Sequence, residues 1–455
     1  MQKERYAVSL EKVNTSAYLA KLTAPVFVEL LLQLLVGNMD QLMISQYSQV
    51  SVAAIGNANQ ILNIFILTFS VISLAVTILT AQYIGAQNRE MIARIYSLAL
   101  FLNGAVGLLI SAVLLLFSRP IFTMMQVPPE IMEESCLYIS IVGGFLFLQA
   151  IALTFSAIFR SNSLPRITMY ISIIVNVVNI VGNLILIYGV GPIPAFGIAG
   201  GAISSVVSRF LGVILLVVFF AKMIRVRISI KNIVPFPKAL FQKMMMIGLP
   251  SGGESLSYNF TQIVIFSMIN LFGTSVITAK VYCSMLAMCA YLFGSALSQA
   301  TQVVVGYLMG AKKIPETHKR VMSTLRITIL ASGSFSVILY LLSDFIFQFL
   351  TQDPTVIALC KTVMLIEIPL EISRAVNMVL VRSLQAAGDV KFPVILGIGS
   401  EWAVAVGLSF LFGVVLGWGL IGVWIAMTLD ETFRAVLFLI RWFQGRWKQK
   451  SLVAG

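Results

Sequence analysis

The chain has 455 residues, of which 59% are hydrophobic and 11% are charged, and its mean hydropathy is +0.96. Soluble globular domains carry roughly a quarter charged residues, so this composition excludes a water-soluble fold of this size. A formal net charge of +13 would favour a nucleic-acid partner for a soluble protein. Here the basic residues lie mostly in loops between apolar segments, so we expect a membrane protein that binds no nucleic acid.

Apolar segments recur along the whole chain, each long enough to cross a hydrocarbon core of about 30 Å as a helix. The first is longer than the apolar core of a signal peptide and contains acidic residues, so we expect it to be retained. The sequence therefore predicts an all-α polytopic membrane protein with twelve transmembrane helices. They are expected near 15–45, 51–84, 93–118, 132–160, 166–189, 196–221, 240–271, 275–309, 318–349, 355–385, 391–415 and 419–443.

The distribution of Lys and Arg predicts the topology, because cytoplasmic loops carry an excess of both residues. They cluster on alternate loops and at both ends of the chain, so we expect a multi-pass protein of the cell membrane with cytoplasmic N- and C-termini. The longest polar interruption, 222–238, lies at the middle of the chain and is the expected cytoplasmic linker. It separates an N-lobe, 1–221, from a C-lobe, 239–443, which a basic tail, 444–455, follows.

Sequence landmarks recur at a nearly constant spacing, which indicates duplicated halves. Two parallel six-helix repeats predict two pseudo-symmetric lobes, with the substrate passing between them. The matching landmarks are Pro25 with Pro250, Glu29 with Glu254, Gly85 with Gly310 and Arg166 with Lys391, all 225 positions apart, and Gly197 with Gly419, 222 apart.

Polar residues within apolar segments are candidate site residues, because a charge at mid-bilayer costs several kcal/mol and tends to face a bundle interior or an aqueous cavity. Helical spacing places each of four sets on one helix face. A solvated helix end, amide contacts between helices and an internal ion pair are alternative explanations. The sets are Glu29, Gln33 and Asp40 on helix 1; Asn179 and Asn183 on helix 5; Glu254 and Tyr258 on helix 7; and Glu367, Glu371 and Arg374 on helix 10.

Another acidic and basic group lies near the end of the chain. Asp430, Glu431 and Arg434 on helix 12 form either a further ion pair or an anchor at the cytoplasmic end, and Glu401 is expected at a membrane boundary.

The chain lacks the motifs of ATP-driven transport and of intramembrane hydrolysis. It contains no G-x-x-x-x-G-K-[ST] loop, no H-E-x-x-H and no Ser/His/Asp set, and its four cysteines follow no metal-binding spacing. Its one histidine, His318, lies in a basic loop and is expected to be solvated. We therefore expect a transporter rather than an enzyme, with no cofactor and with a coupling ion as the energy source.

Several segments in chain order resemble the multidrug and toxic compound extrusion (MATE) family of transporters, bacterial type, over essentially the whole length. They are "LTAPVFVELLLQLLVGNMDQLMIS", "SVAAIGNANQI", "AQYIGAQN", "NVVNIVGNLILIYG", "FGIAGGAISSVVSR", "IGLPSGGESLSYN" and "LQAAGDVKFP". The resemblance implies a V-shaped arrangement of the two lobes and export of organic cations in exchange for H⁺ or Na⁺. We expect a monomer embedded in membrane lipid.

The resemblance also implies roles for particular residues. Asp40 matches the carboxylate of the first helix, and Glu254 matches a carboxylate of the seventh helix that couples the ion in one bacterial subgroup. Asn179 and Asn183 match a helix-5 pair whose second member is an aspartate in another subgroup. Arg374 stands where the first subgroup has a helix-10 aspartate, whose role Glu371 or Glu367 could take. The possible Na⁺ sites are Asp40 with Asn179, or Glu254 with Glu371.

The mechanism predicted from these residues is competitive exchange. A carboxylate in a dry cavity can alternate between holding a proton and attracting a cation, while one lobe rocks against the other to give alternating access. The alternative function is a lipid-linked saccharide flippase of related two-lobed architecture. That function usually needs a strongly cationic cavity, whereas the polar residues predicted within the membrane here are mainly acidic.

Overall fold

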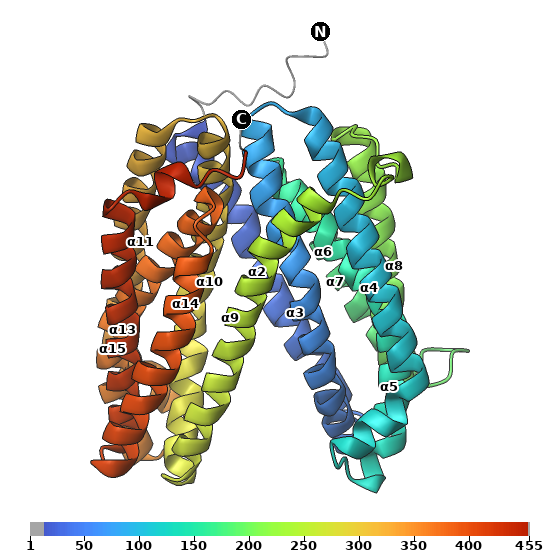
Figure 1. The fold of residues 1–455 in the computed structure, drawn as a ribbon. Helices are drawn as coiled ribbons and strands as arrows, with labels where there is room; N and C mark the ends of the chain where they lie inside the picture. The colour runs from blue at the N-terminus through green and yellow to red at the C-terminus, as the bar shows by residue number, and fades with distance from the viewer. Residues whose placement is uncertain (1–12, 454–455) are drawn as a thin grey trace. The chain divides into compact units, whose positions relative to one another are not determined.

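The computed structural model describes residues 13–453, in which the regular elements are helices joined by short loops (Figure 1). The chain forms two compact units. One, Ala24–Gly248, is called the N-unit below. The other consists of the described residues 249–453 together with 13–23, and is called the C-unit.

Each unit contains the equivalent of six long helices, some of which consist of two or more consecutive segments. The N-unit contains most of α2 (Ser16–Ser45), then α3 (Gln49–Gly85), α4 (Arg89–Met124), α5 (Pro129–Gly144), α6 (Leu146–Ser161), α7 (Pro165–Tyr188), α8 (Gly197–Met223) and the 3₁₀ turn η1 (Ile230–Asn232). The C-unit contains most of α9 (Lys238–Asn270), then α10 (Thr274–Gly310), α11 (Ile314–Leu341), α12 (Ser343–Leu350), α13 (Pro354–Ala387), α14 (Lys391–Ser400), the π-helical segments η2 (Glu401–Val406) and η3 (Ser409–Val415), α15 (Gly419–Phe443) and the turn η4 (Arg446–Gln449).

The predicted number of membrane-crossing helices agrees with these elements. Within residues 13–453, eight helices are long and apolar enough to span a membrane, and α5 with α6, bent by 43°, makes a ninth. The other three long helices, α9, α13 and α15, have 33, 34 and 25 residues and contain the acidic and basic residues described below. The fold is therefore the expected all-α membrane fold of two six-helix halves.

The repeat extends to the backbone at matched turns. Gln87 and Lys312, 225 positions apart, both have the left-handed conformation, with φ of 57° and 58°, and both follow a Gly-Ala pair at the end of the second helix of a half. Gly197 and Gly419 both have positive φ, 55° and 59°, at the start of the sixth helix. The duplicated sequence therefore terminates and starts equivalent helices by the same local conformations.

Small residues allow the last two helices of each unit to pack closely, as membrane helices require because lipid gives them little hydrophobic driving force to associate. A Cβ at Gly200 of α8 would overlap the Leu186 carbonyl of α7. At the matched position in the other half, a Cβ at Gly422 of α15 would lie 2.7 Å from the Phe412 carbonyl oxygen. These glycines position α7 and η3, respectively, against the last long helix of their own unit.

The eleventh helix spans 391–415 as predicted, and within it the geometry changes from α- to π-helical at Glu401. One expectation needs correction. His318 was expected to be solvated, but it accepts a 3.0 Å hydrogen bond from Trp442 Nε1 and stacks on that ring. The physical reason is that the end of α15 packs an aromatic side chain against the start of α11, and an indole N–H needs a partner.

Candidate functional site

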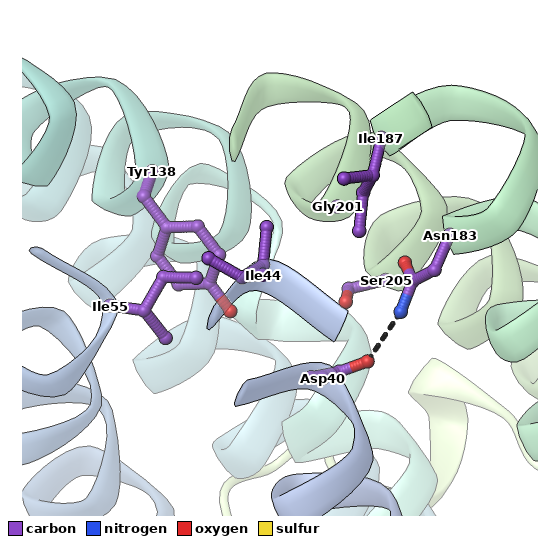
Figure 2. Close-up of a pocket in the computed structure, with 8 residues that line it drawn as sticks. All are labelled: Asp40, Ile44, Ile55, Tyr138, Asn183, Ile187, Gly201 and Ser205. Atoms are coloured by element: carbon purple, nitrogen blue, oxygen red, sulfur yellow. Dashed lines mark hydrogen bonds between the residues drawn. The ribbon is translucent and has the colours of Figure 1, made fainter. Parts of the chain in front are cut away.

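The first predicted site lies inside the N-unit, where Asp40 of α2 faces Asn183 of α7 (Figure 2). Asn183 Nδ2 donates a 2.6 Å hydrogen bond to Asp40 Oδ1. A charge-assisted bond of this length fixes the carboxylate at one edge of a small pocket. The other residues that line the pocket are Ile44, Ile55, Tyr138, Ile187, Gly201 and Ser205.

The two asparagines of α7 lie one turn apart, so both project toward the same side of the helix. Asn179 Nδ2 donates to Ser205 Oγ at 3.2 Å, and Ser204 Oγ donates to the Asn179 carbonyl at 2.8 Å. Asn179 and Asn183 are 3% and 1% exposed, and the Oδ1 atom of each is buried without a hydrogen-bond partner. The pocket therefore combines the Asp40 carboxylate with the amide oxygen of Asn183, while Asn179 contacts the pocket residue Ser205.

The cation that acts electrostatically on Asp40 is Arg209 of α8, which also acts on Tyr138. Three isoleucines, Ile44, Ile55 and Ile187, form half of the residues in the remaining wall of the pocket. Asp40 is consequently a half-buried acid in a largely apolar pocket, an environment that makes the gain or loss of one charge energetically important.

The other two residues of the predicted helix-1 stripe have different surroundings. Glu29 is 4% exposed and accepts a 2.9 Å hydrogen bond from Thr168 Oγ1 in the first turn of α7, whereas Gln33 is exposed. The Glu29–Thr168 and Asp40–Asn183 contacts show that α2 and α7 run side by side in the same direction. Asp40 and Asn183 are thus brought together, Asn179 is linked to the pocket through Ser205, and Glu29 and Gln33 are not part of that pocket.

The second predicted site lies in the C-unit and centres on Arg374 of α13. Its Nη1 atom contacts Glu371, and lies 3.5 Å from Glu367 Oε1. Glu367 Oε2 also accepts a 2.6 Å hydrogen bond from Trp424 Nε1 of α15. The i, i+4 and i+7 spacing of the three α13 residues places them on one face, which is where the predicted stripe of charged residues lies.

A second guanidinium, Arg434 of α15, extends this cluster. Its Nη2 atom lies 2.6 Å from Asp430 Oδ2 and 2.9 Å from Glu431 Oε1, and its Nη1 atom lies 3.8 Å from Glu401 Oε1. Glu431 connects the two guanidiniums, because its Oε1 atom is also 3.9 Å from Arg374 Nε. We refer to Glu367, Glu371, Arg374, Glu401, Asp430, Glu431 and Arg434 as the C-unit charge cluster.

The C-unit charge cluster contains five carboxylates and two guanidiniums. Every one of its carboxyl residues is less than 9% exposed. With all groups ionised the cluster would carry a formal charge of −3, and an uncompensated buried charge is strongly unfavourable. The cluster must therefore hold protons or other cations.

The remaining predicted residues of the C-unit lie on α9. Glu254 faces α14: a Cβ added at Gly397 would lie 3.0 Å from Glu254 Oε1. The cations that act on Glu254 electrostatically are Arg382 and Arg434, rather than Arg374. Tyr258, one turn further along, is 42% exposed, and Arg374 and Glu431 act on it.

The residues of α15 and Glu401 contribute more to this site than the sequence indicated. Of the two predictions for Asp430, Glu431 and Arg434, the further ion pair is confirmed, whereas Glu401, expected at a membrane boundary, is buried beside Arg434. The signal that could have identified them is the presence of three charged residues within one turn and a half of a spanning helix.

Together, the fold and the two polar sites define a class of protein, namely a membrane transporter built from two repeated helical units with ionisable residues in each interior. Comparisons with known proteins agree. The MatE family model matches this chain twice, at residues 25–185 and 250–411, and the starts of the two matches are 225 positions apart. The chain belongs to the MatE (multidrug and toxic compound extrusion) family of transporters.

Relatives and solved structures of this family cover nearly the full length. The chain is 36% identical to the uncharacterized transporter YisQ of Bacillus subtilis over 95% of both proteins. It is 23% identical to the probable multidrug resistance protein NorM of Thermotoga maritima, over 96% of this chain and 94% of that one. A crystal structure of a MATE protein in the bent conformation superposes with a TM-score of 0.87 at 19% identity, covering 97% of this chain and 98% of the other.

Proposed function

We propose that this transporter exports organic cations across the cell membrane by proton-coupled antiport, acting as a monomer and by alternating access. The observation that carries the proposal is Asp40, a half-buried carboxylate held by a single amide donor in a pocket with isoleucine walls. Such a group can bind a proton or face a cation, and the two occupants exclude each other.

The exchange needs no chemical step besides proton transfer. A proton that enters from outside binds a carboxylate oxygen of Asp40 and removes the charge that attracts the organic cation. The cation leaves, and the proton is lost on the opposite side of the membrane, where the carboxylate can attract another cation. One proton moving in for one monovalent cation moving out leaves the net charge of the carrier unchanged.

The charge in the interior of the C-unit supports a cationic rather than an anionic solute. Arg374 and Arg434 both pair with acids that outnumber them. A lipid-linked pyrophosphate needs unpaired guanidinium or ammonium groups. The flippase alternative is therefore disfavoured by the same acids that favour an organic cation.

Coupling to Na⁺ is the second candidate, and one observation favours it. Asn183, whose Nδ2 atom donates to Asp40, has an Oδ1 atom that is buried without a hydrogen-bond partner. Oxygen ligands of this kind suit a hard cation. The experiment below therefore varies the two ions independently.

The test is efflux of an ethidium-like cation from proteoliposomes in which the pH and Na⁺ gradients are imposed separately. For one-for-one exchange, each unit of pH gradient can sustain about a tenfold cation gradient, because one unit corresponds to about 1.4 kcal/mol. Asp40→Asn should abolish the pH-driven gradient while leaving the protein folded, since the amide has the volume of the acid and no titratable charge. A pH-driven gradient equal to that of the wild type would refute the role of Asp40.

A matched control separates this effect from a general one. Asp344→Asn makes the same chemical change at an exposed ion pair with Lys361 and should leave efflux unchanged. Efflux driven by the Na⁺ gradient alone would favour the second candidate, and efflux driven by neither gradient would refute cation-coupled export.

A further inference from the structure

The five carboxylates of the C-unit charge cluster are not equally compensated. Glu371 contacts Arg374, and Glu367 accepts a 2.6 Å hydrogen bond from Trp424 besides lying near the same guanidinium. Both acids of α13 therefore have a close donor. Each can remain ionised at a moderate cost.

The two acids of α15 are compensated still better. Asp430 lies 2.6 Å from Arg434 and accepts a hydrogen bond from Ser400 Oγ. Glu431 lies 2.9 Å from Arg434 and accepts a 2.6 Å hydrogen bond from Asn377 Nδ2. The guanidinium of Arg434 thus already forms close ion pairs with two carboxylates of its own helix.

Glu401 is the exception. It is 3% exposed, its Oε1 atom is 3.8 Å from Arg434 Nη1, beyond hydrogen-bonding distance, and its Oε2 atom is buried without a hydrogen-bond partner. An ionised carboxylate in this position would have a weak counter-charge and an unsatisfied oxygen. Of the five carboxyl groups, Glu401 therefore loses the fewest stabilising contacts when it binds a proton and becomes neutral.

The surroundings of Glu401 add negative rather than positive charge. Besides Arg434, the charged groups that face it are Asp430 of α15 and Glu254 of α9. Gly397 lies one turn before Glu401 on α14, and its lack of a side chain leaves room there for the Glu254 carboxyl group. Glu254 itself faces Arg382 as well as Arg434. Glu254 and Glu401 consequently form a neighbouring acid pair between α9 and the eleventh helix.

Local structure supports a functional rather than a packing role for this position. Glu401 is the first residue of η2, where the helix becomes π-helical, and such insertions are frequent at functional sites. Trp402 Nε1 donates a 3.0 Å hydrogen bond to Ser257 Oγ, and Ser257 is also within hydrogen-bonding reach of Glu401. The Ser257 hydroxyl can donate to an ionised Glu401 carboxylate or accept from a protonated one, so Glu401 keeps this partner when it gains or loses a proton.

We propose that Glu401, paired with Glu254, is a second proton-carrying carboxylate of this transporter and releases its proton when the C-unit charge cluster takes up a cation. The release rests on the proposed function, whereas the protonated state of Glu401 does not. The proton moves from the Glu401 carboxyl group to water. The positive charge of the bound cation then replaces that of the released proton, so the net charge of the site does not change. No residue of the N-unit takes part in this step.

Infrared difference spectroscopy between neutral and alkaline pH tests the protonated state in purified protein without any substrate. The wild type should show the carbonyl stretch of buried protonated carboxyl groups at neutral pH, and Glu401→Gln should lose the contribution of one such group. Glu316→Gln, the same change at a half-exposed residue in the first turn of α11, should keep the full band. A band of undiminished intensity in Glu401→Gln, or the absence of any band from the wild type, would overturn the proposal. If Glu401→Gln does not fold, Glu401→Asp decides instead: a shifted band supports the proposal and an unshifted band overturns it.

The pH dependence of tetraphenylphosphonium binding tests the release. If one proton leaves for each cation bound, the affinity changes by about tenfold per pH unit over the titrating range. Glu401→Gln should reduce the slope of log Kd against pH by about one compared with the wild type and with Glu316→Gln. Equal slopes would overturn release from Glu401. A wild type that neither binds nor transports the cation would refute the proposed function instead, and the infrared result would still decide whether Glu401 carries a proton.

Discussion

Asp389, in the loop between α13 and α14, is expected to be a major contributor to the stability of the C-unit. It is 0% exposed and accepts hydrogen bonds from Arg441 Nε at 2.7 Å and Nη2 at 3.2 Å, and from Lys450 Nζ at 2.7 Å. The Arg441 side chain is 10% exposed and that of Lys450 is 42% exposed. The loop thereby fixes both the end of α15 and the segment that follows η4.

The substitution Asp389→Asn leaves the buried Arg441 guanidinium without a counter-charge, which typically costs about 3–5 kcal/mol. Because the amide can still accept one hydrogen bond, the lower end, about 3 kcal/mol, is expected. Lys450→Ala removes only a half-exposed partner and should cost about 0–1 kcal/mol. The measurement is the free energy of unfolding by SDS titration in mixed micelles. Equal values for the two variants would refute the argument.

The same residue gives a pH dependence whose sign follows from its pKa. Burial by itself raises the pKa of Asp389, but the hydrogen bonds from Arg441 and Lys450 outweigh burial, so the pKa lies below its ordinary value of 3.8. A carboxyl group with a depressed pKa in the folded state stabilises the protein above its unfolded-state pKa and loses that contribution as the pH falls through the folded-state value. The stability difference between the wild type and Asp389→Asn should thus be complete above about pH 5 and shrink below about pH 4.

Two further predictions concern α14 and the topology. Gly397→Ala should lower pH-driven efflux, because its Cβ would lie 3.0 Å from Glu254 Oε1 and displace that carboxyl group. The control Gly399→Ala should not lower efflux, because there is open space around Gly399. Equal efflux from both variants would show that the position of Glu254 is unimportant. Ile230 is 77% exposed, and Ile230→Cys can be introduced after the four native cysteines are replaced. This variant should react with an impermeant maleimide only in inside-out vesicles. Labelling of intact cells would reverse the topology predicted from Lys and Arg.

Much of the fold could be predicted from the sequence, because the physical rules involved are local or one-dimensional. A helix that crosses lipid must be long and apolar, and this gave the twelve helices with bounds close to those observed. The spacing of 225 between landmarks gave the repeat, which the paired left-handed residues Gln87 and Lys312 extend to the backbone.

The candidate site was only partly predictable. Helical periodicity placed Asn179 with Asn183, and Glu367 with Glu371 and Arg374, since residues on one helix face are determined by spacing alone. It also grouped Glu29 and Gln33 with Asp40. Periodicity could not show that Glu29 pairs with Thr168 and that Gln33 is exposed, because both depend on which neighbouring helix covers each turn.

The sequence by itself determined the membrane environment, the duplicated halves and the acidic character of the interior, because these follow from composition, spacing and charge. The tertiary structure alone decided which charges meet: Arg434 approaches Glu401 across two helices, and Gly397 makes room for Glu254 between α9 and α14. The physical reason is that hydrogen bonds and close ion pairs form only when the partner atoms lie within a few ångströms of each other. The rotation and axial position of each helix against its neighbours therefore determine the partners, and no pattern along one helix encodes them.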